Sequence, residues 1–161
     1  MYFIRVFLSG VAGGVAWVLG MLIFFGPAQT ILADPQLQSA KFLTVVKQME
    51  PLPRMADNLW VGVLGLLMIG VIYGIVFSFI ESLMSGKSLI KGVKFGAISW
   101  ALMVPWFEFY LPWNVMHEPL VLVILEALLW ACVLQLVGIS ISLTSNLLDW
   151  GKPIAQIHRK V

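Results

Sequence analysis

Residues 120–143 read LVLVILEALLWACVLQLVGISISL, a stretch in which Glu126 is the only charged side chain. The hydrocarbon core of a bilayer is about 30 Å thick, and an α-helix needs about 20 apolar residues to cross it. Because the bilayer core offers no water to backbone amides, a helix that satisfies its own hydrogen bonds is the favoured conformation there. The stretch therefore predicts a transmembrane helix.

Three further stretches of the chain have the same character. Residues 6–26 and 59–80 contain no charged residue, and residues 95–113 contain only Glu108. The whole chain is 60% hydrophobic and 11% charged, with a mean hydropathy of +0.95. This composition excludes a water-soluble enzyme, a disordered chain and a nucleic-acid-binding module. It predicts an all-α polytopic membrane protein, in which residues 1–161 form one bundle of four transmembrane helices.

The basic residues near the ends of these stretches predict the orientation of the bundle. Seven of them fall before the first stretch, in the loop 81–94 and in the tail 144–161, so they share one side of the membrane. Cytoplasmic loops carry an excess of Lys and Arg. We therefore expect both termini to be cytoplasmic, most naturally in the inner membrane of a bacterium, and the loop 27–58 to lie outside. The seven residues are Arg5, Lys87, Lys91, Lys94, Lys152, Arg159 and Lys160.

The long loop 27–58 contains the pattern of a short amphipathic helix. Asp34 followed by Pro35 resembles a helix N-cap and first turn, and Pro51 and Pro53 end the pattern. The predicted helix either caps the bundle or acts as a lid over a site. The apolar residues at helical spacing are Phe42, Val45, Val46 and Met49.

Small residues recur at every fourth position in, or just before, the first three apolar stretches of the chain. Such spacing allows two helix backbones to approach closely within a membrane. The partner of each small-residue face stays open: it is another helix of this chain, a second copy, or a subunit of a larger membrane complex. The glycines concerned are Gly10 and Gly14, Gly70 and Gly74, and Gly92 and Gly96.

The two acidic residues inside the apolar stretches predict the position of a functional site. Counted from Lys94, Glu108 lies about 21 Å along its helix, and Glu126 lies about 10 Å along its helix from Pro119. The two carboxylates therefore reach a similar depth near the outer surface. Ionisable groups within a membrane usually face the bundle interior or a water-filled cavity.

Other polar and aromatic residues fall near the same depth and complete the set of candidate ligand-binding or proton-binding residues. Two adjacent carboxylates out of water cannot both ionise cheaply, so the pair could share a proton. With aromatic faces beside them, the carboxylates could instead bind an organic cation. The structural alternative is that Glu108 reaches the outer surface and a protonated Glu126 fixes helix packing. The additional candidates are Trp17, Asn114, His117, Glu118 and Trp130.

The sequence predicts no metal site, no cofactor and no catalytic residue. The two histidines, His117 and His158, fall on opposite sides of the predicted membrane, and Cys132 is the single cysteine. The ligand spacings of di-iron bundles and zinc proteases are absent.

The leading functional hypothesis is a non-enzymatic integral membrane protein, either an accessory subunit or a module that responds to a ligand or a proton. The alternative is a proton-coupled or cation transporter that uses Glu108 and Glu126. A weaker alternative is a membrane enzyme that acts on a lipid or quinone through Glu108, His117 and Glu118. The lipid bilayer is the expected partner, and nucleic acid is not.

Overall fold

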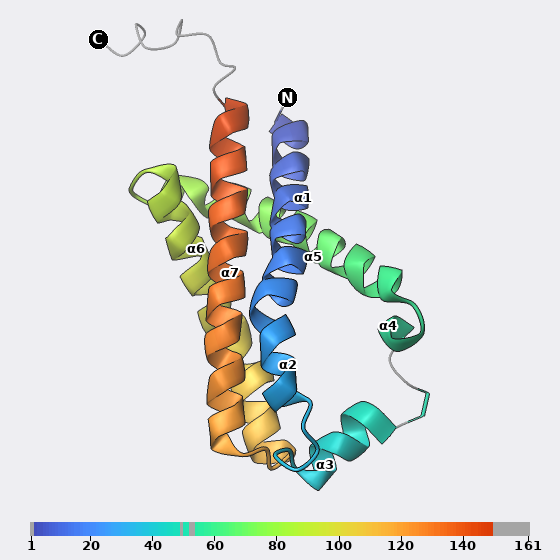
Figure 1. The fold of residues 1–161 in the computed structure, drawn as a ribbon. Coiled ribbons are helices and arrows are strands. Elements are labelled where there is room, and N and C mark those ends of the chain that lie inside the picture. The colour runs from blue at the N-terminus through green and yellow to red at the C-terminus, as the bar shows by residue number, and fades with distance from the viewer. Residues whose placement is uncertain (1, 49, 52–53, 150–161) are drawn as a thin grey trace, which may run out of the picture.

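The fold was analysed in a computed structural model, which describes residues 2–48, 50–51 and 54–149. It is 87% helix, and the described residues contain no β-strand (Figure 1). The all-α prediction is therefore confirmed. Met49, Pro53, Trp150 and the basic residues of the tail, Lys152, Arg159 and Lys160, lie outside the described residues, as does His158.

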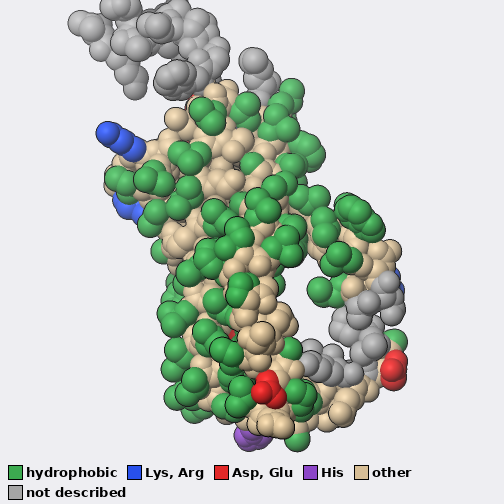
Figure 2. All heavy atoms as spheres, in the orientation of Figure 1, with side chains coloured by type: hydrophobic (Ala, Val, Ile, Leu, Met, Phe, Trp, Pro, Cys, Tyr) green, Lys and Arg blue, Asp and Glu red, His purple; other side chains and the backbone are tan. Residues whose placement is uncertain are grey.

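Three helical segments within the described residues are long and apolar enough to cross a membrane. They comprise residues 2–32, 59–83 and 120–149. Large apolar side chains on these segments and on the helices beside them face outward. Leu102, on a neighbouring helix, is 78% exposed, and Val121, on the segment 120–149, is 77% exposed. Figure 2 shows such side chains covering much of the body of the molecule. A surface of this kind is suited to lipid contact.

The first helical segment is longer than the predicted span. The helix α1 (Tyr2–Gly20) passes into a π-helical turn, η1 (Met21–Phe25), and continues as α2 (Gly26–Leu32). Pro27 does not end the helix; it lies in the first turn of α2, directly after the π-helical turn η1. Residues 27–32, which the sequence assigned to the outer loop, are therefore helical.

The helix α5 (Leu59–Ile80) has the predicted bounds, whereas the two long helices that follow it differ from theirs. Helix α5 begins where Asn58 Oδ1 accepts the Trp60 N–H at 3.0 Å, as Asn58 in an N-cap position should. After the 3₁₀ turn η3 (Glu81–Leu83), the helix α6 (Ser88–Val104) starts inside the predicted loop 81–94. At Pro105 the helix widens into a long π-helix, η4 (Pro105–Val115). The helix α7 (Leu120–Asp149) extends beyond the predicted end at residue 143.

The glycines of α1 and α5 let these two helices touch backbone to backbone. A methyl group added at Gly10 would lie 2.6 Å from Val71 Cα, and one added at Gly74 would lie 2.7 Å from Gly10 Cα. Gly14 and Gly70 face each other in the same way. These glycine faces are therefore covered by contacts within the chain.

The glycines of α6 pack against α7 by the same principle. A methyl group at Gly92 would lie 2.6 Å from Ile139 Cα, and one at Gly96 would lie 2.7 Å from Leu134 O. Gly138 of α7 completes this contact, although the sequence did not single it out. The pair α1 with α5 meets the pair α6 with α7 where α1 and α7 run side by side. Helix α5 crosses α1 and α7 obliquely (Figure 1).

A chain of aromatic rings fills the interior between the helices. Trp130 of α7 packs edge to face on Phe25 at a centroid distance of 5.2 Å and on Trp17 at 6.0 Å. Trp17 continues the chain to Tyr73 at 5.3 Å, and Tyr73 to Phe95 at 6.0 Å. The core therefore connects η1, α1, α5, α6 and α7 through aromatic contacts.

Ion pairs join three chain segments at one end of the bundle. Arg5 near the start of α1 contacts Glu81 at 2.6 Å and Asp149 at the end of α7 at 2.5 Å. Lys91 approaches the other oxygen of Glu81 at 3.9 Å. The start of α1, the α5–α6 connection and the end of α7 thus lie together (Figure 1).

The segment between α2 and α5 contains α3 (Ala40–Leu43), the π-helical turn η2 (Thr44–Gln48) and α4 (Arg54–Asp57). The predicted N-cap at Asp34 is wrong. Asp34 Oδ1 accepts the Gln36 N–H at 2.9 Å and forms a local turn, as Asp before Pro commonly does. Ser39 is the N-cap instead, since its Oγ accepts the Phe42 N–H at 3.0 Å.

Candidate functional site

A cluster of three carboxylates, Glu108, Glu118 and Glu126, forms where α3 meets the connection between η4 and α7. We call it the carboxylate cluster, and we call this end of the molecule the α3 end. It lies opposite the Arg5 ion pairs (Figure 1). Each residue comes from a different part of the chain: η4, the connection, and the second turn of α7.

Glu118 anchors the α3 segment to the bundle. Its side chain is 6% exposed, and its Oε1 accepts the Ser39 backbone N–H at 3.0 Å. Ser39 Oγ lies 3.1 Å from the same oxygen and 2.6 Å from the Met116 carbonyl oxygen. Ser39 therefore caps α3 and holds it to the η4–α7 connection. Hydrogen bonds to a carboxylate are stronger than those between neutral groups.

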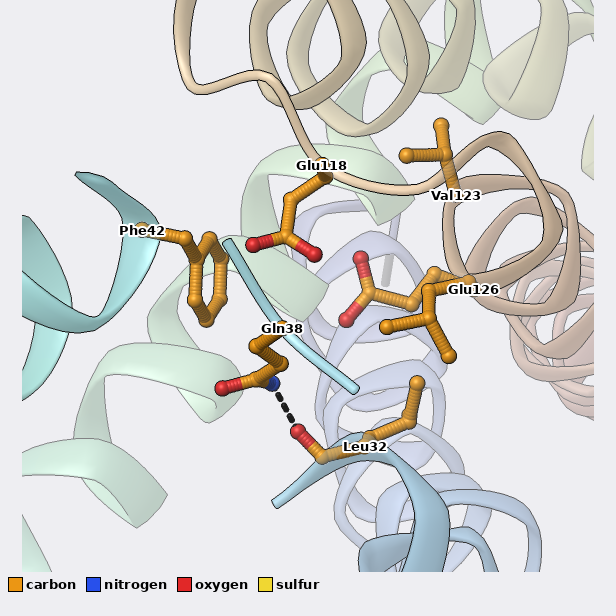
Figure 3. Close-up of a pocket in the computed structure, with 7 residues that line it drawn as sticks. Leu32, Gln38, Phe42, Glu118, Val123 and Glu126 are labelled. Atoms are coloured by element: carbon orange, nitrogen blue, oxygen red, sulfur yellow. Dashed lines mark hydrogen bonds between the residues drawn. The ribbon is translucent and has the colours of Figure 1, made fainter. Parts of the chain in front are cut away.

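Glu126 faces Glu118 across a narrow space. Figure 3 shows the two carboxylates pointing toward each other, with Phe42 of α3 beside Glu118. Of the acidic candidates predicted from the sequence, Glu118 and Glu126 thus line one crevice, which Glu108 does not line.

Glu108 of η4 lies beside the Trp130 indole of α7. Trp130 lies one turn after Glu126 on α7, so the two carboxylates share a structural neighbour. The π-helix η4 carries Glu108, and π-helical turns occur often at functional sites.

The crevice between Glu118 and Glu126 is closed to ligands. Leu32, Gln38 and Phe42 line it from the α2–α3 side, and its free space has no room for a water molecule. The Gln38 amide donates to the Leu32 carbonyl oxygen, as the dashed line in Figure 3 marks. The crevice can take up a proton, but an organic cation would require the α3 segment to move.

Among the side chains that the structure describes, no Lys, Arg or His lies at ion-pair distance from any of the three carboxylates. In the same part of the chain, no three His, Cys, Asp or Glu side chains are grouped so that they could hold a metal ion. Like charges in a site with little water disfavour full ionisation of all three groups.

The remaining predicted site residues lie outside the crevice. His117 and Asn114 are exposed, and His117 adopts a left-handed backbone conformation with φ of 59°. His117 makes no hydrogen bond or ion pair with a carboxylate of the described chain. Trp17 is only 3% exposed and belongs to the aromatic core, where it touches Trp130 but not the crevice.

Sequence reasoning did not identify Ser39 and Gln38 as part of the site. Ser39 had a signal, because serine is a favoured N-cap residue directly before a helical run. The stronger-looking pair of Asp34 and Pro35 competed with it. Gln38 had no such signal, since only the fold brings its amide to Leu32.

The comparisons with known proteins identify a family but no activity. A family described as "Family of unknown function (DUF6789)" matches residues 4–142, and the chain belongs to this family. Neither the curated proteins nor the solved structures contain a match.

Proposed function

We propose that this member of DUF6789 is a non-enzymatic integral membrane protein whose carboxylate cluster binds a proton and thereby controls the docking of α3. The observation that carries the proposal is the direct bond between the two parts: Glu118 faces Glu126 and also holds Ser39, the N-cap of α3. A change of charge at Glu126 therefore acts on the residue that anchors α3.

The hydrogen-bond donors indicate where a shared proton resides. Glu118 accepts hydrogen bonds from the Ser39 backbone N–H and from Ser39 Oγ. Among the described residues, Glu126 accepts no hydrogen bond, and the groups that face it are Glu108, Glu118 and the uncharged Gln38. The proton is held best on Glu126.

The sign of the response follows from this arrangement. With the proton on Glu126, the cluster has one negative charge fewer, and Glu118 stays bonded to Ser39. As the pH rises and Glu126 loses the proton, a new negative charge faces Glu118 in a space with little water. Repulsion then weakens the Ser39–Glu118 contact, so α3 is docked at low pH and released at high pH.

The geometry favours this function over the alternatives. An organic cation would need space between Glu118 and Glu126 that the docked conformation lacks. An enzyme built on Glu108, His117 and Glu118 would need His117 near a carboxylate, whereas His117 is exposed. A bound proton requires neither open space in the crevice nor a histidine beside a carboxylate.

The proposal includes a topology with four spans and both termini in the cytoplasm of a bacterium. The fourth span would comprise α6 and η4, which follow each other without a break from Ser88 to Val115. Arg5, Lys87, Lys91 and Lys94 lie at the end of the molecule away from α3, which supports a cytoplasmic assignment of that end. The carboxylate cluster would then sense the extracytoplasmic pH.

The test measures the distance between α3 and α7 as a function of pH. Spin labels at Lys41 and Val121, both exposed, are introduced into a Cys132→Ser background, and the distance distribution is recorded in lipid nanodiscs. We expect a narrow distribution at low pH that becomes broad as the pH rises. Glu126→Gln, which cannot ionise, should keep the narrow distribution at every pH.

Glu50→Gln provides the matched control, because Glu50 is an exposed acid of the same segment that is not in the crevice. It should respond to pH as the parent does. A pH response that persists in Glu126→Gln would overturn the proposal.

A further inference from the structure

A second feature of the molecule is an apolar cavity that Trp130 lines in part. It lies between η1, α4 and the first half of α5 and has a volume of about 430 Å³. Figure 2 shows the molecule hollowed on this face, between the α1–α2 segment and α5. Its lining includes Met21, Met55, Leu66, Ile69 and Trp130, and these side chains are apolar except for the indole N–H.

Two glycines keep the cavity open. A methyl group added at Gly65 would meet nothing within 4 Å, and one added at Gly62 would meet only the Met55 side chain at 3.6 Å. At the glycines of the α1–α5 contact, such as Gly70, a neighbouring backbone already occupies the space that an added methyl group would need. Gly62 and Gly65 therefore border space that no described part of the chain occupies.

The lining of the cavity follows the first half of α5, from Arg54 just before the helix to Ile69 in its middle. From Leu59 to Ile69 the helix rises about 15 Å at 1.5 Å per residue. A lipid acyl chain within one leaflet of a hydrocarbon core of about 30 Å has a similar length, so one acyl chain could lie along this part of α5.

The charge of the cavity lining indicates which kind of lipid headgroup would bind. Arg54 is the one charged residue in the lining, and it lies at the end where a lipid headgroup would be. Two other apolar cavities of similar volume have no charged lining residue: one between α5 and α6 of about 430 Å³ and one between α1 and α7 of about 470 Å³. A guanidinium binds phosphate through paired hydrogen bonds.

We infer that the cavity between η1, α4 and α5 binds an anionic phospholipid, with one acyl chain against Gly65 and Trp130 and the phosphate at Arg54. This inference does not depend on which side of the membrane the α3 end faces. It adds a lipid ligand to the proposed function, since Trp130 lines the cavity and lies beside Glu108.

The experiment counts bound lipids by native mass spectrometry of the full chain, after exchange into micelles that contain phosphatidylglycerol or phosphatidylcholine. We expect the parent to retain phosphatidylglycerol preferentially. Gly65→Leu, whose side chain fills the cavity, should reduce retention about tenfold. Gly26→Leu is the matched control, because a methyl group at Gly26 also meets nothing within 4 Å but lies outside the cavity. It should retain lipid as the parent does.

Arg54→Gln tests the headgroup separately. It should bind phosphatidylglycerol and phosphatidylcholine equally, because the cavity remains and the charge does not. Equal lipid retention by Gly65→Leu and Gly26→Leu would overturn the acyl-chain site, and a preference for phosphatidylglycerol that survives in Arg54→Gln would overturn the headgroup assignment. Loss of a dimer, rather than of lipid, in Gly65→Leu would show that a second copy occupies the cavity and would also overturn the inference.

A second measurement avoids substitution at Gly65. Phosphatidylglycerol with a photoreactive group in its acyl chain should form adducts on peptides that contain Met55 or Ile69. Adducts confined to the surfaces of α6 and α7 would contradict the proposed site. The pH response of α3 is measured independently, so failure of either proposal is distinguishable from failure of the other.

Discussion

At the scale of single residues, Ser39 connects the local structure of α3 to the carboxylate cluster. Its Oγ caps the helix, and its N–H and Oγ contact Glu118. Because one side chain performs both roles, we expect Ser39→Ala to weaken docking at every pH. Loss of an N-cap alone costs about 1 kcal/mol.

The measurement for Ser39→Ala is the same distance distribution between α3 and α7. It should be broad at low pH, where the parent is narrow. Ser82→Ala is the control, since Ser82 is exposed and lies at the other end of the bundle. If Ser39→Ala kept the narrow distribution of the parent, the role of Ser39 as an anchor would be disproved.

Two tryptophans provide a second prediction at this scale, because their indole N–H groups differ in environment. The Trp100 Nε1–H donates to the Ala127 carbonyl oxygen at 2.9 Å, whereas the buried Trp17 Nε1–H has no partner among the described residues. An unsatisfied buried donor costs about 1–3 kcal/mol. Trp17→Phe removes this cost and should change stability by less than about 1 kcal/mol, despite the smaller ring.

Trp100→Phe should be the more destabilising of the two substitutions, by about 1 kcal/mol, because it removes a satisfied hydrogen bond. Thermal unfolding in detergent, monitored by circular dichroism, compares them directly. A larger loss for Trp17→Phe than for Trp100→Phe would indicate that Trp17 has a partner that its aromatic contacts do not provide.

The candidate site illustrates what single residues reveal before a structure is known. Glu108 and Glu126 were identifiable because charge inside an apolar stretch is rare, and helix geometry placed them at similar depth. Glu118 was included only as a neighbour in sequence. Its anchoring role depends on Ser39, which is 79 residues away in the chain, and no local pattern contains that information.

At the scale of helices, the glycine contacts determine which elements pair. Gly70 is the clearest case, since a methyl group there would lie 2.7 Å from Gly10 O and would also overlap the Gly14 backbone. We expect Gly70→Ala to force α1 and α5 apart and to destabilise the protein by about 1–3 kcal/mol, the usual cost of overpacking.

Gly65→Ala is the matched control for Gly70→Ala on the same helix. Its added methyl group meets nothing within 4 Å, so only the helix propensity changes, in favour of alanine. Thermal unfolding of the two variants should therefore shift in opposite directions. Equal shifts would contradict the assigned α1–α5 contact.

The sequence predicted the small-residue faces of these helices but not their partners. A Gly-rich face is equally compatible with a helix of the same chain and with a second copy, because the spacing is the same in both cases. Gly138 is the one glycine of α7, so no repeated spacing marks it in the sequence. Its role is seen in the structure, where it packs against Gly92 and Gly96. The end of the first span was predicted too early, because Pro27 lies in the first turn of α2 and the helix continues to Leu32.

At the scale of the whole molecule, Arg5 joins three chain segments at the end of the bundle that lies away from α3. It bonds Glu81 and Asp149, and its side chain is 15% exposed. We expect Arg5→Gln to lower the midpoint of thermal unfolding, because two carboxylates lose a charged partner. Lys87→Gln removes the same charge from an exposed position at that end and should have little effect. If both substitutions lowered the midpoint equally, the ion pairs of Arg5 would have no effect beyond the net charge of that end.

The pairing of helices also has a consequence for how the chain assembles. Helix α1 packs most extensively on α5 and α6 on α7, whereas the backbones of α5 and α6 stay apart across the turn that contains Gly86. Each half of the chain is thus a hairpin with its own glycine contact. Two separately translated fragments, residues 1–85 and 86–161, should insert independently and reassociate in the membrane along α1 and α7, which co-purification of one fragment with the other would reveal.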